Sequence, residues 1–267
     1  MSAAPPSDRL TLEDGLVFNG IPRSPARIRG FLTTRSGGSS PAPWATLNAG
    51  TSQGDDAARV QSHLERIGVF AGHPPGGWAR VRMEHGPRVR VVEAPGVAGW
   101  GDGLATRTPD LPLAVTVADC VPLFLWCDEA VALLHCGWRG IARGIVENGV
   151  GTVAALAGAG PSRIAGWIGP GIGRCCYEVG WDVAARIAPV PPAPDPSAKV
   201  PADLGRTVLD RLEALGLARD RIARSVHCTS CRPDLYFSHR RDGAPTGRML
   251  ALIVRDATPP PHPRRSR

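Results

Sequence analysis

A chain of 267 residues, 43% hydrophobic and 21% charged, can bury a substantial core, which excludes wholesale disorder. No apolar run approaches the roughly 20 residues of a membrane-spanning helix, and the first eight residues lack a secretion signal. The formal charge of +7 comes from scattered arginines rather than from a basic stripe with aromatics, which argues against nucleic acid and is compatible with anionic small substrates. We therefore expect a soluble, cytoplasmic protein, as a monomer or a small homo-oligomer.

The pattern of apolar residues predicts one domain over residues 10–256, between a flexible leader at 1–9 and a disordered, basic, proline-rich tail at 257–267. Helical spacing predicts helices at 57–67, 141–156, 179–187 and 204–215, the first with Asp55 as N-cap. Apolar and alternating runs predict strands at 16–18, 28–34, 79–83, 89–93, 111–117, 130–134, 164–168, 225–228, 235–238 and 249–254. Because helices and strands alternate only in part, we expect a layered α/β (α+β) domain with mixed β-sheets.

Three loops are candidates for binding an anion. The Gly/Ser-rich turn at 35–41 follows a strand, and its backbone N–H groups can cradle an anion, or it is a plain surface turn. Arg139 lies in a turn that leads into the helix at 141–156, where a helix N-terminus favours negative charge. In the charged turn at 239–243, Arg240 or Arg241 can reach a phosphate, or the turn is a solvated hairpin tip. The glycine-rich loop at 169–173 lacks the spacing of a nucleotide loop.

The centre of the chain places a cysteine and two histidines at strand ends. Cys120 follows the apolar run at 111–117, and His135 directly follows the run at 130–134. The 15 residues that separate Cys120 from His135 suit two neighbouring strands joined by a turn. His85 lies in another turn at a strand end. Three such ligands with an open fourth position are how a catalytic zinc is held. The same residues also permit a Cys–His nucleophile pair, with Asp119 or Asp102 orienting the imidazole.

The chain has seven cysteines and no secretion signal, so we expect reduced thiols rather than a disulfide framework. Cys228 and Cys231 form a Cys-x-x-Cys pair, which can be a redox pair or half of a zinc site. No second Cys-x-x-Cys pair exists and the thioredoxin context is missing, so we interpret these cysteines as buried or incidental. We interpret the adjacent Cys175 and Cys176 as packing residues.

Several motifs, taken in their fixed order over roughly Phe31 to Val254, resemble the YfiH-type family, also labelled multicopper polyphenol oxidoreductase or laccase-like. These motifs are Thr33-Thr34-Arg35-Ser36-Gly37-Gly38, Thr46-Leu47-Asn48, Gly54-Asp55-Asp56, Ala118-Asp119-Cys120-Val121-Pro122, His135-Cys136-Gly137-Trp138-Arg139-Gly140, Ile168-Gly169-Pro170-Gly171-Ile172, Cys176-Tyr177-Glu178-Val179-Gly180, Phe237-Ser238-His239-Arg240-Arg241-Asp242-Gly243 and Thr246-Gly247-Arg248-Met249.

The resemblance implies a YfiH-like cysteine hydrolase fold and a zinc ion, with copper as the alternative metal, held by His85, Cys120 and His135. It also implies phosphorolysis of purine nucleosides (adenosine, inosine and methylthioadenosine) to base and pentose 1-phosphate, with adenosine deaminase side activity. For that reaction we expect catalytic roles for Cys120, His135, Arg139 and Asp119. We expect substrate binding by Arg35, Asn48, Asp55 and Arg241.

Three other functions stay open. An amidase-like hydrolase that edits peptidoglycan precursors would suit the Cys–His pair. A laccase-like polyphenol oxidase fits less well, because blue-copper oxidases need several histidine-rich sites and this chain has seven histidines. A metal-binding relative that has lost catalysis is the non-enzymatic alternative.

The chain also departs from the family's usual motifs. Met83 and Glu84 replace a Gln-Val pair before His85, Ser62 and His63 replace an Asn-Arg pair, and Cys136 replaces an alanine. The expected metal ligands are kept, while groups expected around the substrate change.

Overall fold

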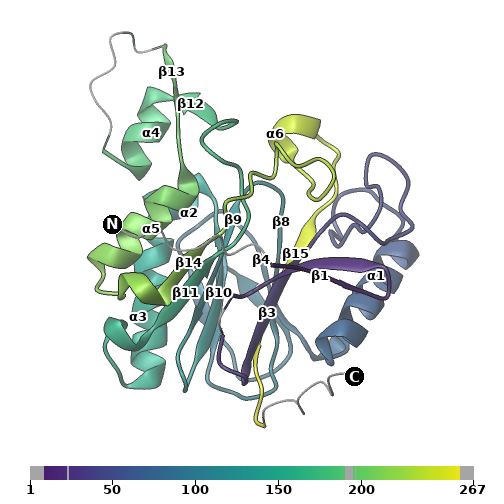
Figure 1. The fold of residues 1–267 in the computed structure, drawn as a ribbon, viewed down its shortest axis with the longest axis horizontal. Coiled ribbons are helices and arrows are strands. Elements are labelled where there is room, and N and C mark those ends of the chain that lie inside the picture. Colours follow the sequence, from purple (N-terminus) through teal and green to yellow (C-terminus); the bar gives the residue numbers. More distant parts are fainter. Residues whose placement is uncertain (1–8, 23, 190–194, 196, 259–267) are drawn as a thin grey trace, which may run out of the picture.

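Two β-sheets packed face to face form the centre of the structure, a computed structural model that describes residues 9–22, 24–189, 195 and 197–258 (Figure 1). One sheet has seven strands in the order β1 (Arg9–Glu13), β2 (Leu16–Gly20), β3 (Ile28–Thr33), β15 (Met249–Arg255), β8 (Leu113–Val117), β4 (Ala79–Arg82) and β6 (Gly96–Trp100). The other has six strands in the order β14 (Ile222–Arg224), β11 (Ala165–Ile168), β9 (Val121–Trp126), β10 (Val131–Cys136), β7 (Gly103–Thr106) and β5 (Val89–Val91). A small separate pair joins β12 (Glu178–Gly180) to β13 (Lys199–Pro201).

Helices cover the outer faces of both sheets. The helix α1 (Ala57–Ala71) packs on the seven-stranded sheet, while α3 (Ile145–Ala157) and α5 (Leu204–Ala214) pack on the six-stranded sheet (Figure 1). Shorter helices are α2 (Trp138–Ala142), α4 (Trp181–Ile187) and α6 (His239–Asp242), and single 3-10 turns occur at Pro75–Gly77, Pro161–Arg163 and Arg219–Arg221. The result is a four-layer αββα arrangement.

The period-two alternation of side chains along the strands separates the core into layers. In β9, Leu123 and Leu125 face the helices α3 and α5, whereas Phe124 faces the opposite sheet. In β15, Ile253 faces the six-stranded sheet, whereas Leu252 faces α1. Both faces of the central strands are therefore buried, which explains why their sequences are continuous apolar runs rather than polar–apolar alternations.

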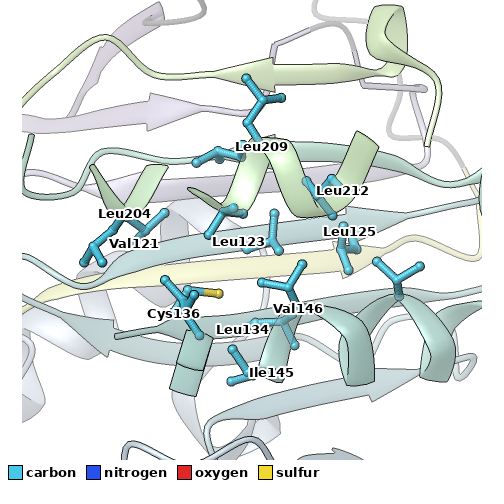
Figure 2. Close-up of a cluster of buried hydrophobic side chains, with 14 of the residues drawn as sticks. Val121, Leu123, Leu125, Leu134, Cys136, Ile145, Val146, Leu204, Leu209 and Leu212 are labelled. Atoms are coloured by element: carbon cyan, nitrogen blue, oxygen red, sulfur yellow. The ribbon is translucent and has the colours of Figure 1, made fainter. Parts of the chain in front are cut away.

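Figure 2 shows the core layer beneath α3 and α5. Leu204, Leu209 and Leu212 of α5 lie over the β9 side chains, and Ile145 and Val146 of α3 lie beside Leu134 of β10. Every one of these side chains is at most 4% exposed. This packing fixes the hairpin of β9 and β10, whose ends carry the central cysteine and histidine.

The expected fold class is confirmed: the chain forms one layered α+β domain with mixed sheets. The leader at 1–8 and the tail from 259 lie outside the described residues, so the predicted flexibility of these segments stays a prediction. Among the described helices, none has both the length and the apolar character needed to cross a membrane.

Several details of the predicted elements are wrong. The N-cap of α1 is Asp56, which accepts a hydrogen bond from the Arg59 backbone N–H at 2.8 Å, because Asp55 instead bonds to the preceding loop. The expected helix at 141–156 is two helices, interrupted at Gly144, whose φ of 91° is left-handed. No strand forms at 225–228 or 235–238, and the first two residues of the helix expected at 179–187 belong to the strand β12, so that α4 begins at Trp181.

We predict that Leu134→Ala destabilises the protein by roughly 2–5 kcal/mol. The substitution leaves a cavity between β10 and α3 that the packed neighbouring side chains cannot easily move to fill. Leu134 is fully buried. The matched control is Leu12→Ala, at a position that is 73% exposed, which should change the free energy of unfolding by less than roughly 0.5 kcal/mol. Urea denaturation of the two variants measures both values, and equal effects would contradict the layered core.

Candidate functional site

A cleft of about 460 Å³ opens beside strand ends of both sheets. It is lined by Gln53, Met83, His85, Thr116, Ala118, Asp119, Cys120, His135, Trp138, Arg139, Ile172, Tyr177, Leu204, His239, Arg240 and Arg248. These residues come from strand ends, α2, α6 and the connecting loops. Segments far apart in the sequence therefore meet at one opening.

The cysteine and the two central histidines converge inside this cleft. The ligand atoms of His85, Cys120 and His135 all lie within 4.8 Å of one another, and the two imidazole rings meet edge to face with centroids 5.0 Å apart. The hairpin explains the meeting of Cys120 and His135: His135 pairs with Pro122 across β10 and β9, and Cys120 immediately precedes β9. The sequence suggested that Cys120 belongs to the end of the run at 111–117, which is β8 of the other sheet. In the structure it belongs to the β9–β10 hairpin.

The buried carboxylate of Asp102 holds this group in place. It accepts hydrogen bonds from the backbone N–H groups of Glu84 (3.1 Å), His85 (3.0 Å) and Gly86 (2.7 Å), and from His135 Nδ1 (2.9 Å). One side chain therefore fixes both the turn that carries His85 and the orientation of the His135 ring. With Nδ1 donating to Asp102, His135 directs Nε2 toward Cys120.

Backbone geometry at the site is unusual and the space is tight. His85 has a φ of 55° and Asp119 a φ of 84°, both left-handed for residues with side chains, which is typical of strained functional positions. A Cβ at Gly137 would lie 3.1 Å from Cys120 Sγ and 3.3 Å from His85 Cδ2. The chain can pass this close only because residue 137 has no side chain.

The three groups polarise one another. Burial alone would raise the pKa of the Cys120 thiol, but the charge of His135 and hydrogen bonds from both histidines lower it to about 6. Burial opposes protonation of His135, but the Cys120 thiolate and Asp102 raise the pKa of His135 to about 10. In contrast, burial raises the pKa of the neighbouring Cys136 thiol, which faces the opposite side of β10.

The residues fit a metal ion. Two imidazole nitrogens and one thiolate form a donor set that suits zinc, and also suits copper. The buried carboxylate behind His135 is the second partner that metal-bound histidines commonly have. The group can therefore hold a zinc or a copper ion.

Three guanidinium groups share the cleft with the cysteine–histidine group. Arg139 lies over the Trp138 ring at 4.6 Å, and Arg240 lies over the Tyr177 ring at 4.9 Å. Arg248 is partly buried, donates to the carbonyls of residues 246 and 247, and has its pKa lowered by that burial. This concentration of positive charge at one opening favours an anionic ligand.

Asp119 lines the cleft, as expected, but both of its carboxylate oxygens are engaged. Oδ1 accepts from the Thr229 hydroxyl at 2.6 Å, and Oδ2 accepts from the backbone N–H of Arg240 at 2.6 Å. Asp119 therefore positions the start of α6, which carries Arg240. All four expected catalytic residues, Asp119, Cys120, His135 and Arg139, line the cleft.

The four residues expected to bind substrate lie outside the cleft lining and hold the loops around it. Arg35 donates to the Ala45 carbonyl at 2.7 Å, and Arg241 donates to the carbonyls of Thr229 and Tyr236. Asn48 is buried and hydrogen-bonded to Asp55 and to its own loop. Its Oδ1 also accepts from the backbone N–H of Arg248 at 2.9 Å.

Asp102 orients the His135 ring, as one of the two candidates that the sequence offered for this role. Sequence reasoning missed Arg248, Tyr177 and the bonds from Asp102 to the turn that carries His85. Arg248 belongs to a quoted motif, Thr246-Gly247-Arg248-Met249, but a lone arginine before a strand carries no spacing signal. Asp102 follows a glycine and precedes another, in a loop whose partner turn is 17 residues away along the chain. The contact forms because β5, which follows the His85 turn, pairs with β7, which follows Asp102.

The stacked mixed sheets and the cysteine–histidine cleft define a YfiH-type protein. The structure matches YlmD from Geobacillus stearothermophilus with a TM-score of 0.84 and 34% identity, covering 93% of this chain and 99% of that one. It matches the Bacillus licheniformis hypothetical protein YfiH with a TM-score of 0.82 and 28% identity, covering 92% and 98%. The chain belongs to the multi-copper polyphenol oxidoreductase laccase family, whose profile matches residues 29–256.

Curated relatives in this family carry a different functional name. A Geobacillus stearothermophilus protein named purine nucleoside phosphorylase YlmD is 36% identical over 247 residues, covering 84% of this chain and 89% of the relative. A Deinococcus radiodurans protein named purine nucleoside phosphorylase is 38% identical over 238 residues, covering 83% and 87%. The resemblance inferred from the motifs is thereby confirmed.

We predict that Asp102→Asn raises the pKa of the Cys120 thiol in metal-free protein, because the neutral amide no longer stabilises the charged His135 that faces the thiol. The thiolate is the form that reacts, and it predominates only above the pKa. As the pH is lowered, alkylation of Cys120 should therefore continue down to about pH 6 in the wild type, and should already slow at a higher pH in the variant. Peptide-resolved mass spectrometry after iodoacetamide treatment measures this. The control, Asp128→Asn, alters an exposed carboxylate and should leave the profile unchanged.

Proposed function

We propose that this protein is a zinc-dependent purine nucleoside phosphorylase. It converts adenosine, inosine or methylthioadenosine and phosphate into the free base and pentose 1-phosphate, with adenosine deamination as a side activity. The observation that carries the proposal is that three arginines and a cysteine–histidine metal-ligand group share one cleft of about 460 Å³. The names of the relatives supply the reaction class.

His85, Cys120 and His135 would hold the zinc. When bound, a zinc ion in such a site supplies a Lewis acid and can provide hydroxide at neutral pH, which the deaminase activity requires. The role of Asp102 is to fix the His135 tautomer, so that Nε2 stays available as a ligand.

The arginines provide the phosphate subsite. Arg139, Arg240 and Arg248 would bind the phosphate oxygens by charge-assisted hydrogen bonds and hold the anion against the anomeric carbon. A phosphate oxygen then bonds to that carbon as the bond from carbon to the base nitrogen breaks. Asn48 contributes by accepting the Arg248 N–H, and Asp119 by accepting the Arg240 N–H, so both act as positioning residues.

The aromatic side chains suit the purine. Trp138 and Tyr177 line the same cleft and offer flat surfaces on which a base can stack. Burial raises the pKa of Tyr177 to about 12, so its hydroxyl stays protonated at neutral pH. It can therefore donate a hydrogen bond to the base, on which negative charge develops as the glycosidic bond breaks.

The decisive reaction is inosine cleavage with and without phosphate. The purified protein should release hypoxanthine and ribose 1-phosphate only when phosphate is present, and Cys120→Ser should abolish this because the metal-ligand group loses its thiolate. Liquid chromatography measures both products. Ammonia release from adenosine tests the side activity in the same samples.

One observation favours a second candidate, a Cys–His hydrolase. Asp102, His135 and Cys120 form a chain in which the imidazole lies between a carboxylate and a thiol whose pKa is about 6, as in a nucleophile–base pair. A hydrolase would cleave its substrate without phosphate. Its activity would survive chelation, whereas the phosphorylase should lose activity when the metal is removed; alkylation of Cys120 should inactivate both.

We predict that Arg248→Ala raises the KM for phosphate by roughly tenfold or more, because one charged hydrogen bond to the anion is lost. The KM for inosine should change much less. The control, Arg143→Ala, removes an exposed guanidinium that does not line the cleft, and both constants should stay near wild type. Initial rates over a phosphate titration give the answer. An unchanged KM for phosphate in Arg248→Ala would place the anion elsewhere.

A further inference from the structure

A second cluster of metal-ligating side chains lies outside the candidate active site. The Sγ atoms of Cys175, Cys176, Cys228 and Cys231 all lie within 4.8 Å of one another. The Cys231 sulfur is 3.5 Å from that of Cys175 and 3.4 Å from that of Cys176, and all four thiols are free. Around a tetrahedral ion with metal–sulfur bonds of about 2.3 Å, sulfur atoms are separated by about 3.8 Å, which is close to this arrangement.

The topology of the six-stranded sheet explains how these cysteines meet. The strands β11 and β14 are parallel neighbours, with Ile168 opposite Arg224, so the chain leaves both strands at the same edge. The two loops that follow are then joined by a bridge between Gly171 and Cys228 and by a hydrogen bond from the Thr229 N–H to the Gly171 carbonyl. One loop carries an adjacent cysteine pair and the other carries a Cys-x-x-Cys pair. The sequence analysis interpreted these residues as buried or incidental and as packing residues; Cys228 is buried, and the fold brings the two pairs together.

The surroundings of Cys228 are those of a thiolate ligand. Its sulfur accepts a hydrogen bond from the backbone N–H of Gly173 at 3.1 Å. Such a backbone donor stabilises a sulfur that carries negative charge. A Cβ at Gly173 would lie 3.3 Å from Cys175 Sγ and 3.4 Å from Cys228 Sγ, so a glycine leaves the space beside the sulfurs open.

We propose that Cys175, Cys176, Cys228 and Cys231 form a tetrathiolate site for a structural zinc ion, separate from the His85–Cys120–His135 group. Four thiolates without an open position are the ligand set of a structural zinc rather than a catalytic one. Two of the cysteines, 175 and 231, are exposed, so the site has a path for metal entry. The proposal does not depend on which reaction the active site performs.

A metal ion at this site would also stabilise the two loops that border one side of the cleft. Thr229 lies between the two cysteines of the Cys-x-x-Cys pair and donates to Asp119, while Ile172 and Tyr177 flank the other loop and line the cleft. A metal ion that joins the two loops would therefore keep Asp119 and Tyr177 in position. Because a metal that binds only the folded form stabilises it, chelation should also lower the melting temperature.

Metal content after reducing, anaerobic purification tests the proposal. We expect about two zinc ions per wild-type chain, about one in Cys120→Ser, and about one in the double variant Cys175→Ser with Cys231→Ser. Both serines replace exposed residues, so the double variant should fold, as circular dichroism would show. Cys127→Ser is the matched control, since this cysteine belongs to neither cluster and its loss should leave the metal content unchanged.

Cobalt(II) provides the second readout. In Cys120→Ser, bound cobalt should show the intense absorption of a tetrahedral ion with thiolate ligands, and Cys231→His should keep the ion but alter the spectrum. If the double variant does not fold, this spectral change still decides the question. Thiol titration of denatured, chelated protein should find all seven cysteines reactive.

Three results would overturn the proposal. Only five reactive thiols in the wild type would mean that the cluster forms a disulfide instead. Seven reactive thiols with no metal and no cobalt spectrum in Cys120→Ser would mean an incidental cluster. A metal content that the double variant does not lower would place any second ion elsewhere. Loss of metal from Cys120→Ser alone concerns the active site and leaves this proposal standing.

Discussion

The contact on which the candidate active site depends is the buried carboxylate of Asp102. A buried charge is unfavourable unless it is hydrogen-bonded on all sides, and here three backbone N–H groups and the His135 ring satisfy it. These partners come from two strand ends in different sheets. The same bonds that compensate the burial therefore join the sheets at the cleft, hold the His85 turn in its left-handed conformation and orient His135 toward Cys120.

The two cysteine clusters arise from one property of the six-stranded sheet. At the central hairpin, antiparallel pairing brings the residue before β9 to the end of β10, which joins Cys120 to His135. At the sheet's edge, the parallel pair of β11 and β14 releases two loops side by side, which joins Cys175 to Cys231. Both clusters lie at the same ends of these strands, and Thr229 links them by its bond to Asp119.

The fold class and the grouping of the central cysteine with two histidines could be predicted because their signals are local or lie within motifs. Continuous apolar runs mark strands buried on both faces, and Cys120 and His135 stand at the ends of such runs, whereas His85 follows the alternating strand β4. The partner of the Cys-x-x-Cys pair could not be predicted, because it is an adjacent pair 52 residues earlier that carries no zinc spacing. Asp102 was one of two candidates to orient His135, but its contact with the His85 turn and the place of Arg248 were missed for a similar reason, because both depend on residues that are distant along the chain.

The positions at which this chain departs from its family's motifs have unequal consequences. His63 is buried, accepts the Ser39 N–H and contacts the Asn48 carbonyl, so it supports the loop whose Asn48 holds Arg248. Cys136 faces the helical side of β10, and Ser62 and Glu84 are exposed. Met83 is the departing residue that lines the cleft. Its thioether gives the cleft a flexible apolar surface at this position, so Met83 is the departing residue best placed to contact a bound ligand.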